Sequence, residues 1–465
     1  MLRAAAAADA GDRRVGDRVV GMSATTANMY RMVSIAEAQE TVLKAISPLP
    51  VMSIGLMDAM GYILGKNVIA REPLPPFPAS IKDGYAVVSS DGIGDYDVAF
   101  EALAGTAAGH LKAGTVAYIT TGAPLPHGAD AVVQIENTEK LPPGPEGQQR
   151  VRIVKPAKGP RDDVRALGSD IAAGEVVLAA GSLIGAAEIG LLATVGRATV
   201  KVRRKALVAV LSTGDELVEP DQDALGPGQI RDANRFMLAA AARSAGCNVV
   251  DLGIARDDPA QVEAKFQEAL STGVEVLLTS GGVSVGDRDF IKPILERQGT
   301  VHFGKVRMKP GKPLTFATIN ATASRSSSGQ LVVFGLPGNP VSSIVTFNLV
   351  VLPALRAMAG WPEPRLRRVH ARTQTDIKLD PERPEYHRVS LHWHRTGESA
   401  GELAAASTGG QISSRLLSMR SANALLELPA AQGVLPAGSI VSALLIDDLG
   451  SMPVPEGIPM IVPAL

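Results

Sequence analysis

Three short apolar runs in the middle of the chain place the strongest limit on its fold. They lie at residues 206–211, 274–278 and 331–334, and segments with helical spacing separate them. Unbroken apolar strands that alternate with helices are typical of a parallel sheet that is covered on both faces. We therefore predict a central, doubly wound α/β domain over residues 205–362.

The regions on either side of this domain predict further, mostly β units. Runs broken by Gly and Pro predict a small β subdomain over residues 76–155, inserted into a discontinuous, mixed and elongated N-terminal subdomain of residues 32–75 and 156–204. That subdomain opens with a helix, because Ser34 begins a capping box and Pro48 ends the helical pattern. After residue 363, apolar and polar residues alternate, and we predict a β-barrel over residues 363–465.

The first 31 residues are rich in Ala and Arg, which is compatible with an organelle transit peptide. Three acidic residues interrupt them, and transit peptides are poor in acids. We therefore expect residues 1–31 to be a disordered leader, with the transit peptide as the alternative.

Charge and cysteine content exclude several classes of partner and site. The formal net charge is 46 − 47 = −1, so no basic field favours nucleic acid. Cys247 is the single cysteine, which rules out an intrachain disulfide and a cysteine-rich metal site. No run of 18 apolar residues is free of charges, so we expect no membrane span and a cytoplasmic location.

Three polar, glycine-rich loops follow the predicted central strands, at residues 212–216, 279–289 and 335–343. In an open parallel sheet, ligands bind beyond the carboxyl ends of the strands. Gly281 and Gly282 allow backbone amides to approach an oxyanion closely. Pro340 suits the first turn of a helix, whose N-terminus would point amides at the same ligand.

A stiff cationic loop lies between these segments. Residues 305–313 hold four cations among two prolines and a glycine, and lysines suit phosphate or a similar oxyanion as compact charges. Asp215, Glu216, Asp287 and Asp289 supply the oxygen ligands that Mg²⁺ prefers. Taken singly, each of these features has an ordinary structural explanation, and Asp232 is as readily a helix cap as a ligand. Their occurrence at one sheet edge indicates an anion-binding, Mg²⁺-assisted site.

The motifs as a set resemble one family. Pro-Phe-Pro-Ala-Ser-Ile-Lys-Asp-Gly-Tyr-Ala at 76–86 and Thr-Thr-Gly-Ala-Pro-Leu-Pro at 120–126 are similar to its N-terminal signatures. Thr-Gly-Asp-Glu, Ser-Gly-Gly-Val-Ser-Val-Gly-Asp, Lys-Pro-Gly-Lys-Pro and Leu-Pro-Gly-Asn-Pro then follow in the same order. The family is molybdopterin molybdenumtransferase, which includes the E domain of gephyrin and its plant counterparts. The resemblance runs from about Met32 to the C-terminus.

The resemblance implies an activity and an assembly. The family inserts molybdate into adenylyl-molybdopterin, with Mg²⁺-assisted release of AMP, and yields molybdenum cofactor. It has four subdomains and works as a homodimer with a shared active site. A pterin-adenylylating enzyme is the implied upstream partner.

The same resemblance assigns roles to positions of this chain. Ser284, Asp289, Glu216 and Asp232 match catalytic positions, and Asp215, Glu216 and Asp289 are the implied metal ligands. The substrate-binding positions, the first three of them reaching in from the partner chain, are Asp83, Thr121, Asp170, Gly281, Gly282, Asp287, Pro337 and Gly338. The implied molybdate-binding positions are Lys309, Lys312, Pro313, Ser343, Arg388 and Ser418.

Two other functions remain open from the sequence. An adenylyltransferase that makes the pterin adenylate shares the Ser-Gly-Gly motif, although the N-terminal 170 residues and the C-terminal barrel argue against it. A receptor-clustering scaffold, as in gephyrin, is the second alternative. The intact cationic and acidic loops favour catalysis over a purely structural role.

Overall fold

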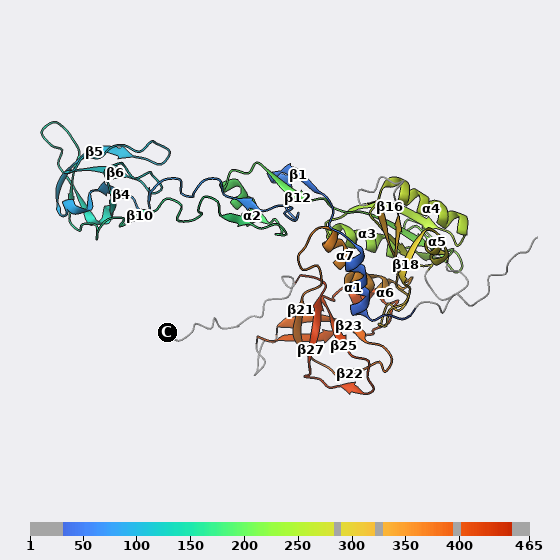
Figure 1. The fold of residues 1–465 in the computed structure, drawn as a ribbon. Coiled ribbons are helices and arrows are strands. Elements are labelled where there is room, and N and C mark those ends of the chain that lie inside the picture. The colour runs from blue at the N-terminus through green and yellow to red at the C-terminus, as the bar shows by residue number, and fades with distance from the viewer. Residues whose placement is uncertain (1–30, 283–289, 321–328, 394–400, 449–465) are drawn as a thin grey trace, which may run out of the picture. The chain divides into compact units, whose positions relative to one another are not determined.

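The computed structural model describes residues 31–282, 290–320, 329–393 and 401–448. They form two compact units (Figure 1). Unit 1 draws on Met1–Ser47, Ala206–Leu355 and Pro364–Leu465, and unit 2 on Pro48–Lys205 and Arg356–Glu363.

Unit 1 contains the predicted α/β sheet. Its six strands lie in the order β16 (Asn248–Ala255), β13 (Leu207–Thr213), β17 (Val276–Ser280), β20 (Gln330–Leu336), β19 (Thr315–Asn320) and β18 (Gly299–Phe303). The first four strands are parallel, which confirms the central prediction. β19 and β18 add an antiparallel edge that the sequence analysis did not identify.

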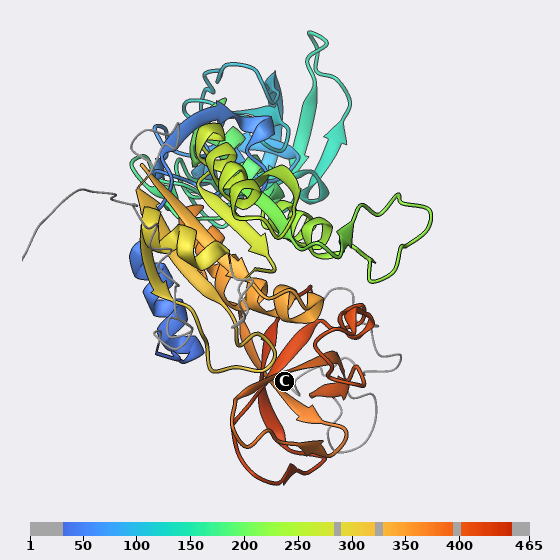
Figure 2. The same ribbon diagram turned by 90° about the vertical axis from the view of Figure 1, so that its right-hand side faces the viewer.

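Helices cover both faces of this sheet, as predicted (Figure 2). On one face, α4 (Pro259–Thr272) and α5 (Ile291–Gln298) bury Phe266 and Ile294 against Leu211 and its neighbours. On the other face lie α3 (Asn234–Ser244) and α6 (Pro340–Thr346), which contact β13, β17 and β20.

Helix α1 (Ile35–Ala45) begins with the predicted capping box, in which Ser34 and Glu37 bond to each other's backbone amides. It packs within unit 1, because Val33 forms a β-bridge to Val306 and the Gln39 Nε2 donates to the Leu349 carbonyl at 2.7 Å. The structure thus groups α1 with the α/β domain, whereas the sequence pattern assigned it to the N-terminal subdomain. Helical spacing identifies an apolar face but does not identify what covers it.

The helix after β20 contains a π-helical segment, η5 (Phe347–Val351), between α6 and α7 (Leu352–Met358). Pro353 has no amide hydrogen, and its ring would clash with the carbonyl four residues earlier, at Leu349. That carbonyl accepts from Gln39 instead. The whole helix, Pro340–Met358, is long and apolar enough to cross a membrane, but 78% of the apolar window is buried inside the protein, which is the packing of a core helix.

The C-terminal part of unit 1 is the predicted β-barrel. The closed barrel consists of β21 (Arg368–Thr373), β24 (Leu403–Ser407), β23 (Glu385–Trp393), β25 (Ala424–Leu428) and β27 (Ile440–Leu445). A two-stranded pair, β22 (Ile377–Lys378) and β26 (Val434–Leu435), and a short helix, η6 (Leu416–Met419), accompany it. Val389 and Leu391 point into the barrel core, as their alternation predicted.

Unit 2 contains the predicted small β subdomain. Its six-stranded sheet runs in the order β7 (Ala131–Gln134), β4 (Gly84–Val87), β6 (Thr115–Ile119), β5 (Gly94–Ala102), β9 (Arg150–Ile153) and β8 (Thr138–Leu141). Short helices η3 (Ser89–Asp91) and η4 (Ile135–Asn137) join its strands.

The rest of unit 2 is built from short paired strands. These pairs are β1 (Val51–Gly55) with β12 (Thr199–Arg203), β2 (Val68–Ile69) with β11 (Val176–Leu178), and β3 (Ala79–Ser80) with β10 (Val164–Arg165). Helices η2 (Leu56–Asp58) and α2 (Ala186–Thr194) accompany them, and Leu64, Ile184, Leu192 and Val202 form the local core.

Candidate active site

The glycine-rich loops meet at one edge of the α/β sheet. Strand register places Ser212 beside Ser280, and Ser280 beside Leu336, so the loops that follow β13, β17 and β20 begin side by side. Carboxyl ends of adjacent parallel strands are where such sheets bind ligands. The sequence therefore placed these loops correctly.

Two glycines after β17 have backbone conformations that favour glycine. Gly281 has φ +87° and Gly282 has φ +65°. A Cβ at Gly281 would lie 2.6 Å from the Thr213 carbonyl oxygen, so this loop packs directly on the end of β13. Ser284, Asp287 and Asp289, which the sequence analysis placed in the same loop, lie outside the described residues.

Asp232 is buried at the start of α3, next to a small parallel pair, β14 (Leu217–Val218) and β15 (Ile230–Arg231). Its carboxylate accepts from the Ser212 hydroxyl at 3.0 Å, and from the backbone amide and the Nε of Arg235 at 3.2 and 3.0 Å. Both carboxylate oxygens are therefore engaged: Asp232 accepts one backbone amide from the first turn of α3, whose N-cap is Ala233, and forms an ion pair with Arg235.

Arg235 extends this network outward. Its buried guanidinium also pairs with Asp251 of β16 and with Glu219. Burial by itself would lower the pKa of Arg235, but the hydrogen bonds to Asp251 and Asp232 outweigh burial, and the pKa is raised. The arginine therefore stays charged and ties the segment after β13 to the sheet.

Asn234 is a residue of this edge that sequence reasoning missed as a site residue. Its side-chain Nδ2 lies 2.7 Å from the Ser280 hydroxyl and 2.7 Å from the Gly338 carbonyl. Its position two residues after Asp232, at a helix start facing the sheet edge, was the available signal.

The predicted metal ligands are only partly within the described residues. Asp215 accepts the backbone amide of Asp257 at 3.1 Å, and the neighbouring Glu216 is exposed. Both carry the carboxylate oxygens that Mg²⁺ prefers, so the donor type fits. Among the residues that the structure describes, no group of three or more His, Cys, Asp or Glu could hold a metal ion.

The cationic loop lies against the barrel. The backbone of Lys309 forms an isolated β-bridge with that of Glu385 in β23. The Lys309 Nζ lies 2.9 Å from the Glu385 carboxylate and 3.4 Å from the Asp380 carboxylate. Burial alone would lower the pKa of Lys309, but the two carboxylates outweigh it and raise the pKa. Lys312 is exposed, and within the described ranges no carboxylate lies at ion-pair distance from it.

Arg388 is the most unusual side chain of this junction. Strand alternation would place it outside the barrel core, yet it is fully buried. Its Nε donates to the Ser418 hydroxyl at 3.0 Å and one terminal nitrogen donates to the Ile412 carbonyl at 3.4 Å. Burial lowers its pKa, although Glu385 opposes the shift, and no described carboxylate is within ion-pair distance. It is thus a buried cation with no ion pair at contact distance in the described part of the chain.

Contacts between loops bring the predicted molybdate residues to the same junction. The Val341 amide of α6 donates to the Ser413 carbonyl at 3.0 Å, so the start of α6 meets the barrel segment that holds Ser418. Gly311 of the cationic loop packs against Thr346, one turn from the buried Ser343. Ser343 in turn donates to the Pro337 carbonyl at 2.8 Å.

Three predicted substrate-binding residues lie in unit 2. Asp83 and Thr121 come together, because the Asp83 carboxylate accepts the Thr121 amide at 2.7 Å. Asp170 pairs with Arg165 of β10, the strand that pairs with β3. The three residues therefore lie in loops that flank the β3–β10 pair.

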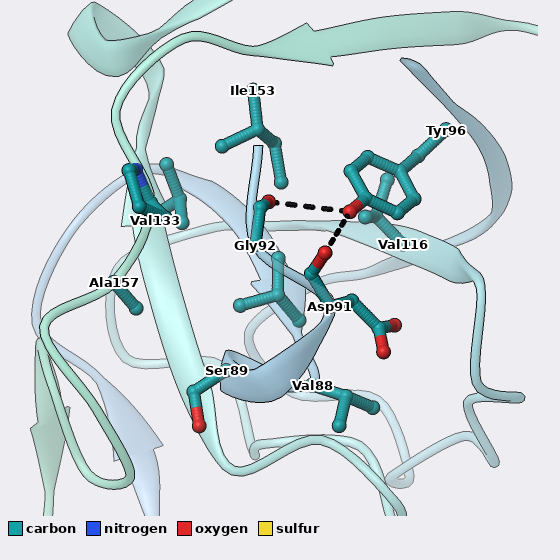
Figure 3. A pocket seen from close by; sticks show the side chains of 11 residues that line it. Val88, Ser89, Asp91, Gly92, Tyr96, Val116, Val133, Ile153 and Ala157 are labelled. Atoms are coloured by element: carbon teal, nitrogen blue, oxygen red, sulfur yellow. Dashed lines mark hydrogen bonds between the residues drawn. The ribbon is translucent and has the colours of Figure 1, made fainter. Parts of the chain in front are cut away.

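A pocket in the small β subdomain is separate from all of these residues. Its cavity volume is about 10 Å³, and at its wall the Tyr96 hydroxyl lies 2.8 Å from the Asp91 carbonyl and 3.2 Å from the Gly92 carbonyl (Figure 3). None of the predicted site residues lines it.

Comparison with known proteins accounts for nearly the whole chain. The MoeA N-terminal region (domains I and II) matches residues 33–196, a probable molybdopterin binding domain matches 209–357, and the MoeA C-terminal region (domain IV) matches 370–446. The solved MoeA protein of Pyrococcus horikosii, a molybdopterin biosynthesis protein, is 29% identical, with a TM-score of 0.74 over 90% of this chain and 100% of that one.

Curated relatives give the same result. Gephyrin of Dictyostelium discoideum is 38% identical over 93% of this chain, and cinnamon, a molybdenum cofactor synthesis protein of Drosophila melanogaster, is 39% identical over 77%. The chain spans 64% and 57% of the lengths of these two proteins. Molybdopterin molybdenumtransferase of Haemophilus influenzae is 32% identical, over 88% of this chain and 98% of that protein. The chain therefore belongs to the molybdopterin molybdenumtransferase family.

Proposed function

We propose that this chain is a molybdopterin molybdenumtransferase that inserts molybdate into adenylyl-molybdopterin and releases AMP. The observation that carries the proposal is Arg388, a fully buried guanidinium that Glu385 influences only from beyond ion-pair distance and that has no closer carboxylate among the described residues. An unpaired buried cation is costly to a folded protein unless an anion joins it. A compact dianion such as molybdate would supply that charge.

The residues around Arg388 suit such an anion. Lys312 offers an exposed cation, and Ser343 and Ser418 would contact the anion once their hydroxyls turn from the Pro337 and Arg415 carbonyls to which they donate in the structure. The start of α6, an N-terminus at which backbone amides concentrate, lies at the same junction. Lys309 would attract an anion less strongly than the sequence suggests, because its ammonium group already forms ion pairs with Glu385 and Asp380. We assign Lys309 and Pro313 to the wall of the site and the direct charge contacts to Arg388 and Lys312.

The sheet edge would hold the adenylated pterin. Gly281, Gly282, Pro337 and Gly338 form its backbone-lined surface, on which amides can approach phosphate oxygens closely. Ser284, Asp287 and Asp289 are proposed for the same edge on their sequence alone. Asp232 has both oxygens engaged, so we propose that it orients the edge.

Mg²⁺ belongs to the proposal as a cofactor. Asp215 and Glu216, with Asp289, would hold it, and when bound it would offset the negative charge of the pyrophosphate whose cleavage releases AMP. The residues of the chain would meanwhile orient the two substrates and keep molybdate next to the dithiolene.

Assembly and location follow the family resemblance. We propose a cytoplasmic homodimer in which Asp83, Thr121 and Asp170 serve the active site of the partner chain. A pterin-adenylylating enzyme would supply the substrate.

A reconstitution assay tests the activity. Purified protein receives adenylyl-molybdopterin, molybdate and Mg²⁺, and AMP release is followed beside activation of a cofactor-free molybdoenzyme. Asp289→Ala and Glu216→Gln run in parallel with the unchanged chain. We expect AMP release that depends on molybdate and is lost in both variants. Binding of the adenylate without AMP release would refute the transferase and favour a carrier or scaffold.

A further inference from the structure

The turn that opens α3 contacts the ends of neighbouring parallel strands. Asp232 accepts from Ser212 at the end of β13, and Asn234 donates to Ser280 at the end of β17. The second Asn234 bond reaches Gly338, in the loop after β20. One short turn is therefore bonded to all three loops of the proposed substrate edge.

Asn234 links the loop after β17 to the loop after β20. Among the described residues, no other side chain forms hydrogen bonds to both loops. The Asn234 side chain is nine-tenths buried, and its hydrogen bonds to Ser280 and Gly338 are both 2.7 Å long. The partners belong to loops that already approach each other, since a Cβ at Gly338 would lie 3.9 Å from the Gly281 Cα. The Gly281 amide also donates to the Leu336 carbonyl at 3.2 Å, and the Asn234 carboxamide adds a side-chain link between the same two loops by donating one hydrogen to each.

The remaining atom of that carboxamide is left without a partner. The Asn234 Oδ1 is buried and accepts no hydrogen bond from the residues that the structure describes. Reversing the amide would face Oδ1 toward the Gly338 carbonyl, which cannot donate, so the donor side of the amide must face the two loops. A buried acceptor without a donor is unfavourable for stability. If Asn234 served folding alone, we would not expect it to hold an unsatisfied buried oxygen while it links two loops.

We infer that Asn234 is a positioning residue of the transferase reaction, acting through the loops after β17 and β20. This inference rests on the proposed function. The glycine amides of one loop and the Pro337–Gly338 backbone of the other must address one substrate, so their separation sets its alignment. A displacement of about 1 Å at a reacting centre can cost on the order of 100-fold in rate.

The test compares four single variants, and the double variant of Asn234→Ala with Ser280→Ala, with the unchanged chain. Asn234→Ala removes both donations, Asn234→Asp keeps the side-chain size but removes the donors, and Ser280→Ala removes one acceptor. Asn423→Ala is the matched control: Asn423 is also a buried asparagine, and it bonds both backbone groups of Leu391 in the barrel. We measure kcat and KM for adenylyl-molybdopterin in molybdate-dependent AMP release, together with the unfolding midpoint of each protein.

We expect Asn234→Ala and Asn234→Asp to lower kcat by about 10- to 100-fold per folded molecule, and the control to leave kcat within about twofold. Ser280→Ala added to Asn234→Ala should cause little further loss, because both changes remove the same link. Unchanged kcat and KM in the two folded Asn234 variants would overturn the inference, as would an equal loss in the Asn423 control.

A failure of the proposed function would look different. The unchanged chain would then release no AMP. In that case the clamp, meaning the Asn234 link to Ser280 and Gly338, is tested by measuring the affinity of each variant for adenylyl-molybdopterin without molybdate. Weaker binding by the Asn234 variants than by the Asn423 control would support the clamp, and equal binding would refute it.

Discussion

The substitution Arg388→Met tests whether the buried Arg388 cation serves molybdate binding or the stability of the fold. Methionine retains much of the side-chain length and removes the charge. The change removes donors to Ser418 and Ile412, at a cost of about 1–3 kcal/mol for a buried acceptor left alone. It also removes a buried cation that has no described ion pair at contact distance, and the desolvation of such an ion costs several kcal/mol. We expect the free energy of unfolding to stay within about 2 kcal/mol of the unchanged chain, or to rise.

Arg388→Met should weaken molybdate binding although it leaves the free energy of unfolding nearly unchanged or raises it. A hydrogen bond to a charged group contributes about 1.5–3 kcal/mol, so its loss should raise the KM for molybdate by about 10- to 150-fold. Urea unfolding gives the stability, and AMP release at varied molybdate gives the KM. Arg368→Met is the control, because Arg368 lies on the barrel, is exposed and pairs with Glu427. An unchanged molybdate KM in folded Arg388→Met would refute the assignment of Arg388 to the anion.

Three further changes test other parts of the structure. Gly281→Ala should lower the free energy of unfolding by about 2 kcal/mol or more, because it adds a strained positive φ to a 2.6 Å clash with Thr213; stability within error of the unchanged chain in urea unfolding would contradict this. Lys309→Met removes a cation from the Glu385 carboxyl. In the unchanged chain, burial raises the pKa of Glu385, but His387 and Lys309 outweigh burial and hold the pKa below the ordinary 4.5. The ionised carboxylate therefore stabilises the protein above that pH, and this stabilisation is lost as the pH falls. Acid unfolding should therefore begin at a higher pH in this variant, and an unshifted acid transition would show that the pair does not contribute. Asp83→Asn should reduce AMP release about tenfold or more while shifting stability by about 1 kcal/mol at most, since its carboxylate is exposed and accepts only one backbone amide in the described residues; full activity would remove Asp83 from the proposed site.

Local pattern was sufficient wherever neighbours in sequence are also neighbours in space. The capping box at Ser34, the buried central strands and the loops that follow them depend on residues a few positions apart. Strand period and helix period are fixed by backbone geometry, so the α/β domain and the barrel could be predicted. The position of the glycine loops at one edge followed from the rule that parallel strands share a direction.

Tertiary structure decided which of the candidate groups are free. Lys309 and Lys312 are equivalent in the sequence, yet only Lys309 is neutralised, by carboxylates more than 70 residues away along the chain. Arg388 occupies an outward position of its strand, yet loops distant in sequence bury it without a described ion pair at contact distance. Asn234 became a link between two loops only because the fold brings Ser280 and Gly338 to the start of α3. Charge pairing and burial depend on long-range contacts, and periodicity carries no information about them.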